Sequence, residues 1–277
     1  MHKYRHGILN IIDRQTSDII KKIIFKRFAI DLSFLEDYIF RKRLTYSLNF
    51  LNITPLNNNE QITIITNNQL QIILHCVFPD EAELFRDTDM WNLLKIYILS
   101  KINRENKYKI LFFNATAGED LYSTLILLNE LKIKDNFEIT LISPSTYSIE
   151  KIKNGIISQP KNRTSISNFK TVIPKESITK YLGYINNTLS FDNNLLNNIN
   201  FINCLPFDIV SEDFDLVFSR NKTLCFNNLN IESLFVEISK NIKQSGYMIT
   251  GTNENIPNNI INSFKIIYNN EKIFQKK

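Results

Sequence analysis

A turn of small residues, FFNATAGEDLYS (112–123), is the segment of this sequence best suited to hold a ligand. Its centre, ATAG, ends at Gly118, and a ligand approaches the backbone closely only where side chains are small. Glu119 and Asp120 follow, so a phosphate would meet like charge, and a cationic or hydroxyl-rich ligand is favoured. The alternative stays open that this is an ordinary turn whose acids stabilise the start of a helix.

Other kinds of chemistry find little support in the sequence. The three cysteines, Cys76, Cys204 and Cys225, are scattered and form no CxxC pair, which argues against a zinc site and a disulfide framework. Two of the three histidines lie within the first six residues, so a histidine-rich metal centre is not expected. Unpaired cysteines fit a reducing compartment, and no apolar stretch reaches about 18 residues. We therefore expect a cytoplasmic protein without membrane insertion.

Positive charge is concentrated at the start of the chain. The formal net charge is +5, and residues 1–50 hold ten Lys and Arg against five acids, which accounts for the whole excess. Such a run is either a solvated helix face or a docking surface for an acidic partner. Basic and aromatic residues are not interleaved as in a nucleic-acid platform, so no nucleic acid is expected.

The first eighty residues have the pattern of a small helical domain. Apolar residues recur at helical spacing, and Ser17 is predicted to cap the first helix. Helices are expected at 17–29, 33–50 and 81–102, and two shorter helical segments are expected to cover 60–78.

From residue 107, apolar runs alternate with helical segments. Strands are predicted at 107–113, 137–143, 199–204, 214–219 and 246–251, helices at 119–132, 147–155 and 229–243, and a closing hairpin at 264–268 and 271–274. Residues 156–198 are predicted to be largely irregular, with one helix at 175–182. The alternation predicts an α/β domain over 81–277 with a parallel sheet, whose ligand binds at the carboxyl ends of the strands.

Five segments carry a resemblance to a known family. They are the basic segment 23–44, LFRDTDMWNLL (84–94), FFNATAGEDLYS (112–123), FDLVFSRNKTLCF (214–226) and SGYMITGTNEN (245–255). In this order and spacing they resemble the CheR family of chemotaxis receptor methyltransferases. The resemblance implies a Rossmann-like class I methyltransferase sheet preceded by a small all-helical N-terminal domain (1–80), with S-adenosylmethionine as cofactor.

The resemblance also implies roles for single residues. Arg86 matches the family arginine that lies over the cofactor, and it is the predicted catalytic residue. Glu119 matches the acid at the cofactor's amino-acid end. The implied cofactor-binding set is Asn114, Ala115, Gly118, Glu119, Ser145, Leu205, Arg220 and Asn221.

Several positions depart from the family pattern. Ser145 stands where the family has an acid that accepts hydrogen bonds from the ribose hydroxyls, Leu205 where it has Asn, and Cys225 where it has Tyr. Ala82 replaces a Thr before Arg86. Losing a charge-assisted hydrogen bond costs about 1.5–3 kcal/mol, so these departures imply an eroded cofactor pocket.

Three functions remain open. The first is methyl transfer to receptor glutamates, with the acidic cytoplasmic helices of a chemoreceptor docked on the basic N-terminal helices. The alternative is a catalytically inactive CheR-like protein that serves as a receptor- or partner-binding module. The third is methyl transfer to a small carboxylate, for which the basic helices would be incidental.

Overall fold

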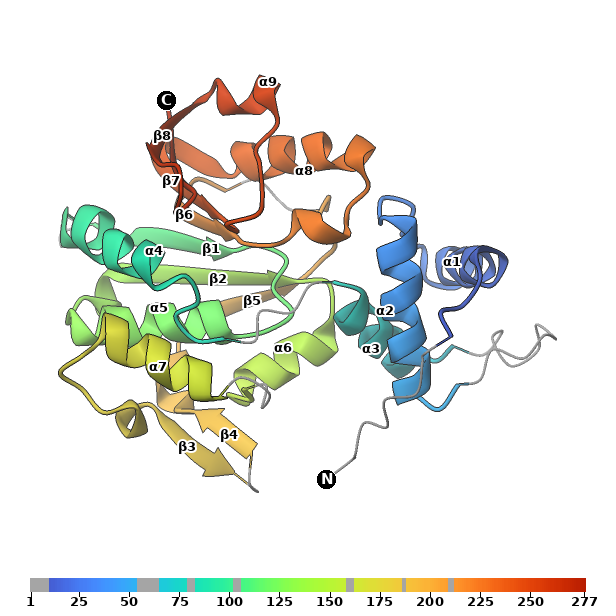
Figure 1. The fold of residues 1–277 in the computed structure, drawn as a ribbon, viewed down its shortest axis with the longest axis horizontal. Helices are drawn as coiled ribbons and strands as arrows, with labels where there is room; N and C mark the ends of the chain where they lie inside the picture. Colours follow the sequence, from blue (N-terminus) through green and yellow to red (C-terminus); the bar gives the residue numbers. More distant parts are fainter. Residues whose placement is uncertain are drawn as a thin grey trace.

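A computed structural model of the chain describes residues 10–53, 65–78, 83–101, 106–157, 162–185, 188–208 and 212–277. Seven strands of these ranges form one sheet in the order β5-β2-β1-β6-β7-β9-β8 (Figure 1). The strands are β1 (Tyr108–Phe112), β2 (Phe137–Ser143), β5 (Ile199–Asn203), β6 (Phe214–Ser219), β7 (Ile242–Thr250), β8 (Phe264–Tyr268) and β9 (Ile273–Lys276). The first five pair in parallel, and β9 runs antiparallel to β7 and β8. The predicted α/β fold with a mostly parallel sheet is confirmed.

The chain changes direction across the sheet between β1 and β6. It passes from β1 through β2 to β5, then returns to β6 and continues through β7 to the closing hairpin. In an open α/β sheet such a switch point leaves a crevice at the carboxyl ends of the two neighbouring strands. The ends of β1 at Phe112 and of β6 at Ser219 therefore mark where a ligand is expected.

Both faces of the sheet are covered, which explains why the central strands β1, β2 and β6 are mostly apolar. In β1, Ile110 and Phe112 belong to one buried cluster and Leu111 to the other. Figure 1 shows α5 and α7 on one side of the sheet and α8 on the other. The helices of this part are α4 (Thr88–Leu93), α5 (Glu119–Glu130), α6 (Thr146–Lys153), α7 (Asn162–Val172), α8 (Asn228–Lys240) and α9 (Asn258–Ile261).

The described residues of the N-terminal part form the helices α1 (Arg14–Phe28), α2 (Asp37–Phe50) and α3 (Asn67–Val77). The predicted cap of the first helix is wrong. Asp13 caps α1 by accepting the Thr16 N–H at 2.7 Å, whereas Ser17 lies inside the helix and donates its hydroxyl to the Arg14 carbonyl. Both residue types can cap a helix, but Ser17 is fully buried against the core. Within the described ranges, no helix combines the length and apolar character needed to cross a bilayer.

The N-terminal helices share a hydrophobic core with the sheet. One buried cluster contains Ile20, Leu44 and Leu74 of these helices together with Val217 of β6 and Phe235 of α8. The helices therefore pack directly on the α/β part. The predicted boundary at residue 80 falls within 79–82, outside the described residues, so the division into 1–80 and 81–277 stays a prediction.

Two backbone hydrogen bonds also fasten the loop between α1 and α2 to the segment after β6. The Glu36 N–H donates to the Cys225 carbonyl at 2.8 Å, and the Asn227 N–H donates to the Phe34 carbonyl at 3.0 Å. The Phe34 ring stacks on Phe226 with centroids 5.0 Å apart. This contact fixes α2 beside the end of β6.

The segment predicted as irregular, 156–198, is largely ordered, so that prediction is wrong. It contains α7 and an antiparallel pair, β3 (Leu182–Ile185) and β4 (Thr188–Phe191), and a short 3-10 turn replaces the expected helix at 175–182. Few apolar residues suffice here because Phe169, Val172 and Phe191 complete an existing cluster rather than build a new one.

Candidate functional site

The turn after β1 is pinned to the neighbouring strand. The Ala115 N–H donates to the Ile142 carbonyl at the end of β2, at 2.8 Å, and Asn114 adopts a left-handed backbone with φ of 50°. A cavity of about 10 Å³ lies beside this turn, and its lining includes Ala115, Ala117 and Arg220. Its volume accommodates about one water molecule. This small cavity lies at the predicted switch point of the sheet.

The buried side-chain amide of Asn114 has no hydrogen-bond partner in the part of the chain that the structure describes. Its side chain belongs to a residue that is 1% exposed, and neither the amide oxygen nor the nitrogen has a hydrogen-bond partner among the described residues. Buried polar groups are normally satisfied, so this amide is available to a ligand or a water.

Packing against Tyr122 requires a glycine at position 118. A Cβ atom at this position would lie 2.3 Å from Cζ of Tyr122, whose ring covers the glycine. Tyr122 is fully buried, donates its hydroxyl to the Ile152 carbonyl at 2.9 Å and stacks on Phe191. Burial raises the pKa of this phenol well above its ordinary value. The glycine therefore has a packing role that the sequence did not indicate, and its contact with a cofactor stays a prediction.

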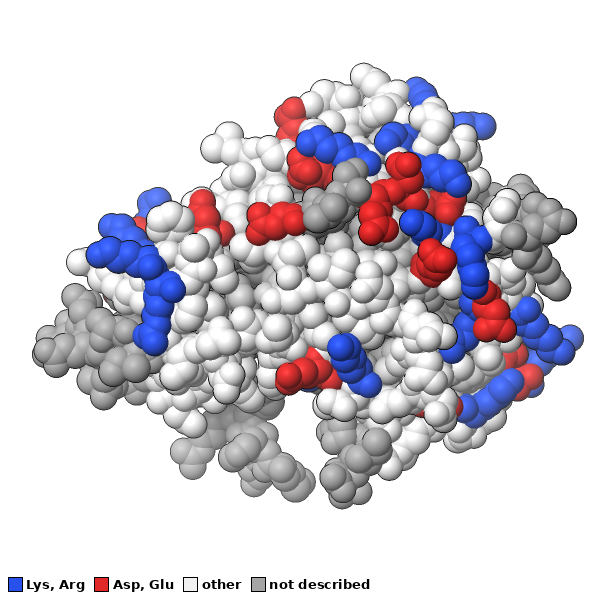
Figure 2. Space-filling model, turned by 180° about the vertical axis from the view of Figure 1, so that it is seen from behind, with Lys and Arg blue, Asp and Glu red and all other residues white. Residues whose placement is uncertain are grey.

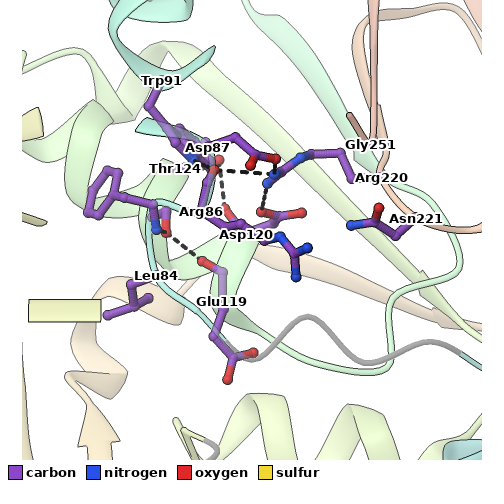
Figure 3. A network of polar contacts seen from close by, with 12 residues as sticks. Leu84, Arg86, Asp87, Trp91, Glu119, Asp120, Thr124, Arg220, Asn221 and Gly251 are labelled. Atoms are coloured by element: carbon purple, nitrogen blue, oxygen red, sulfur yellow. Dashed lines mark hydrogen bonds and ion pairs between the residues drawn. The ribbon is translucent and has the colours of Figure 1, made fainter. Parts of the chain in front are cut away.

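Arg220 is the centre of a buried ion-pair network (Figure 3). Its guanidinium lies 2.6 Å from the Asp87 carboxylate and 2.5 Å from that of Asp120, and it donates to the Arg86 carbonyl at 3.2 Å. The arginine side chain is 1% exposed. The network joins three segments: the end of β6, the first turn of α5 and the loop before α4. Sequence reasoning assigned Arg220 to the cofactor, whereas its described bonds go to protein groups.

Arg86 is held in place through its backbone. Its carbonyl accepts hydrogen bonds from Trp91 Nε1 at 2.9 Å and from Arg220. The residues on both sides, Phe85 and Asp87, have positive φ angles of 51° and 59°, which are unfavourable for a bulky residue such as Phe. In Figure 3 the Arg86 side chain extends toward Asp120, on the side of Asn221. The predicted catalytic arginine therefore lies at the end of β6.

Glu119 and Asp120 take different directions. Asp120 turns to Arg220, while the Glu119 side chain points away from that ion pair (Figure 3). Glu119 is 1% exposed. The two acids at the start of α5 therefore have different surroundings. Asp120 belongs to the ion-pair network of Arg220, whereas Glu119 extends away from this arginine in Figure 3.

Asn221 is fixed by a carboxylate that sequence reasoning did not single out. Its backbone φ is 57°, and its N–H donates to Glu254 Oε2 at 2.6 Å. Glu254 is 1% exposed. Burial raises the pKa of Glu254, and hydrogen bonds from the backbone of Thr223, Gly251 and Asn221 oppose that rise. The only sequence signal for this residue is its place in the segment 245–255.

Ser145 and Leu205 follow β2 and β5. Ser145 is fully buried, donates its hydroxyl to the Gln71 carbonyl of α3 at 2.6 Å, and accepts the Ser148 N–H at the start of α6. The hydroxyl predicted to bond a ribose is therefore engaged by the protein. Leu205 is half-buried, and its carbonyl accepts the Asp208 N–H. Ala82 lies outside the described residues.

A wide groove opens next to the site, between α2 and the short helical turn Thr223–Cys225 after β6. Its volume is about 720 Å³. Tyr38, Lys42 and Tyr46 line it at intervals of four residues, on one face of α2. Cys225 is a buried part of the lining, and burial raises the pKa of its thiol to about 12. The raised pKa disfavours the thiolate, which is the nucleophilic form of cysteine.

The chain is similar in sequence to several known proteins. Residues 80–273 match the family model described as CheR methyltransferase, SAM binding domain. A chemotaxis protein methyltransferase of Borreliella burgdorferi is 26% identical over 272 residues, covering 91% of each chain. A Pseudomonas putida protein named as a methyltransferase, Cher3, is 20% identical over 93% of this chain and 95% of its own. A solved structure from Methanococcus maripaludis, described as an S-adenosyl-L-methionine-dependent methyltransferase, has 14% identity and a TM-score of 0.39, covering 69% of this chain and 86% of that one.

Proposed function

Because the chain belongs to the CheR methyltransferase family, we propose that it transfers a methyl group from S-adenosylmethionine to glutamate carboxylates of a chemosensory receptor in the cytoplasm. The observation that carries the proposal is the double ion pair of Arg220. It assembles Arg86, the first turn of α5 and the end of β6 at the switch point of the sheet, where ligands of such folds bind.

S-adenosylmethionine is the cofactor of this family's domain. The residues after β1 fit it: Asn114 offers a buried amide without a partner among the described residues, and Ala115 contributes only a small side chain to the cavity. Glu119 would hold the amino-acid end. The ribose of the cofactor fits less well, because the Ser145 hydroxyl predicted to bond it already donates to the Gln71 carbonyl.

Methyl transfer to a carboxylate requires little from the protein besides positioning of the two reactants. When bound, the cofactor supplies a methyl group on a positively charged sulfonium. A glutamate has an ordinary pKa of about 4.3, so its carboxylate is ionised at neutral pH and needs no general base. The chain's contribution is to orient the acceptor and exclude water. Arg86 suits this task because Trp91 and Arg220 fix its backbone.

The groove beside α2 is the proposed path of the acceptor. Lys42 offers positive charge between the half-exposed rings of Tyr38 and Tyr46. A second groove, on α1, is lined by Lys21, Lys22 and Lys26. On the left of Figure 2, over the N-terminal helices, basic side chains form a run with few acids, whereas the other side mixes both charges. Opposite charge would speed the encounter with acidic receptor helices.

The test is transfer of radiolabelled methyl groups from S-adenosylmethionine to a receptor cytoplasmic fragment, read as base-labile methyl ester. Lys42→Glu and the double variant Lys22→Glu/Lys26→Glu should each lower the rate at least fivefold. Lys265→Glu, on the distant edge strand β8, is the matched control and should keep the rate within twofold. A small carboxylate as acceptor would leave all three variants equal to the wild type.

The second candidate is a protein with this fold that binds receptors without catalysing transfer. The Ser145 hydroxyl, which already bonds the Gln71 carbonyl, favours it. It predicts receptor binding that depends on Lys42, together with no transfer to any receptor fragment. Detectable ester formation by the wild-type chain eliminates this candidate.

A further inference from the structure

Glu254 lies in the loop after β7 and faces the loop after β6. Its carboxylate is 1% exposed, although the surface is only a few residues away along the chain: Thr252 and Asn253 are exposed. A carboxylate is rarely buried unless its oxygens are paired. The contacts that satisfy it therefore indicate what it does.

Four donors converge on this carboxylate. Oε2 accepts the backbone N–H groups of Asn221 and Gly251, each at 2.6 Å. Oε1 accepts the backbone N–H of Thr223 at 2.7 Å and its hydroxyl at 2.8 Å. Successive N–H groups that point to one anion form a nest, and such charge-assisted bonds are about twice as strong as neutral ones. An ionised carboxylate matches four donors, whereas a protonated one would set its own O–H against one of them.

The same contacts determine the conformation of Asn221. Its left-handed backbone turns the N–H toward Glu254 and places the residue beside Gly251. A Cβ atom at Gly251 would lie 2.2 Å from Asn221 Oδ1 and 2.8 Å from Asn221 N. Asn221 is therefore held from two sides, by hydrogen bonding to Glu254 and by close packing on Gly251.

Arg220 precedes this turn directly, so its position depends on the same anchor. Its guanidinium must reach Asp87 and Asp120 from the last residue before the left-handed turn. Thr252, in the loop of Glu254, also donates its hydroxyl to Asp87, at 3.0 Å. The loop after β7 thus supports both ends of the ion-pair network.

We propose that Glu254 is a positioning residue for cofactor binding, which acts through Asn221 by holding the end of β6 in its left-handed turn. The inference rests on the proposed function for its readout in affinity, but the conformation of residue 221 tests it without any ligand.

The experiment is a double-mutant cycle on the full chain, with affinity for S-adenosylhomocysteine measured by calorimetry. Glu254→Gln keeps the shape but turns amide hydrogens toward the N–H donors, and should weaken binding at least tenfold. Asn221→Ala should weaken it by a similar factor. The double variant should bind no more than twofold worse than the weaker single variant, because both changes remove the same arrangement.

Controls separate positioning from general loss of structure. Glu130→Gln removes a carboxylate that accepts hydrogen bonds from Lys180 and Tyr181 at the far end of α5, and should leave affinity within twofold. Thr223→Val removes one donor from Glu254 and should weaken binding about threefold even if Glu254→Gln fails to fold. Independent losses that multiply in the double variant, or unchanged affinity in Glu254→Gln, overturn the proposal while leaving the proposed function intact.

A wild-type chain that binds no S-adenosylhomocysteine contradicts the proposed function instead. In that event the amide resonances of Asn221, Thr223 and Gly251 decide the inference. They should shift together in Thr223→Val and Glu254→Gln, with residue 221 leaving its left-handed conformation. An unchanged backbone at residue 221 in Glu254→Gln refutes it.

Discussion

The Arg220 guanidinium and the Asp87 carboxylate lie 2.6 Å apart, across 133 residues of sequence. This contact closes the candidate site from one side, because it connects the end of β6 to the loop that carries Arg86. The same guanidinium connects to Asp120 in the first turn of α5. The arginine therefore has a structural task, whatever ligand the site holds.

Removal of this arginine should destabilise the protein. In Arg220→Met, Asp87 and Asp120 would lose the guanidinium that bonds both carboxylates. We expect the free energy of unfolding to fall by about 3 kcal/mol, since removing one partner of a buried ion pair is strongly destabilising. Urea unfolding measures this. Arg41→Met, which removes the more exposed pair with Asp37, should cost less than about 1 kcal/mol, and equal losses in both variants would refute the account.

The close approach of Gly251 to Asn221 predicts a steric effect. Gly251→Ala places a methyl group 2.2 Å from Asn221 Oδ1, so the loop after β6 must shift. We expect a loss of about 2 kcal/mol in stability, as is usual for overpacking. Gly183→Ala is the matched control because no atom lies within 4 Å of its added Cβ. Thermal unfolding should distinguish the two, and a fully stable Gly251→Ala would contradict the packing described.

His75 predicts a dependence of stability on pH. Its ring bonds Ser148 Oγ and lies near Lys151, and burial, followed by the Lys151 charge, lowers its pKa to about 4. The unfolded chain takes up this proton near pH 6.5 and the folded chain only near 4, so acid favours unfolding between these values. Relative to wild type, His75→Gln should gain about 3 kcal/mol between pH 7 and pH 4, as 1.36 kcal/mol per unit implies. A stability difference that does not change with pH would contradict the buried neutral ring.

Restoring the family's acid at position 145 should not restore affinity for the cofactor. Ser145→Asp restores the acid of the family pattern, but it removes the donor to the Gln71 carbonyl and sets two oxygens against each other. The side chain could still cap α6, so the fold should survive. We expect affinity for S-adenosylhomocysteine to change less than threefold, by calorimetry. A tenfold gain would show that the pocket lacks only this charge.

The fold was largely predictable because a strand such as 107–113 contains a continuous apolar run, 110–113, that is buried on both faces of the sheet. The segment 156–198 was not, because its few apolar residues complete a cluster formed by α4 and α5. The predicted start of α1 was wrong because Asp13 and Ser17 are both suitable N-cap residues. Only the packing of Ser17 against the core distinguishes them.

The site was predictable in position but not in its contacts. The motif segments place Arg86 and Asn221 near the end of β6. Sequence alone does not reveal that the Arg220 guanidinium donates hydrogen bonds to Asp87 and Asp120. Glu254 was missed because a single acid in a polar loop has no periodicity, and its burial arises only when two loops meet.

The central claim is that the carboxyl ends of β1 and β6 bind S-adenosylmethionine, and calorimetric titration with S-adenosylhomocysteine addresses it most directly. The account predicts saturable binding at a single site, weakened at least tenfold by Arg86→Ala and severalfold by Asn114→Ala. No heat at millimolar ligand, from a wild-type chain that unfolds cooperatively, would contradict it.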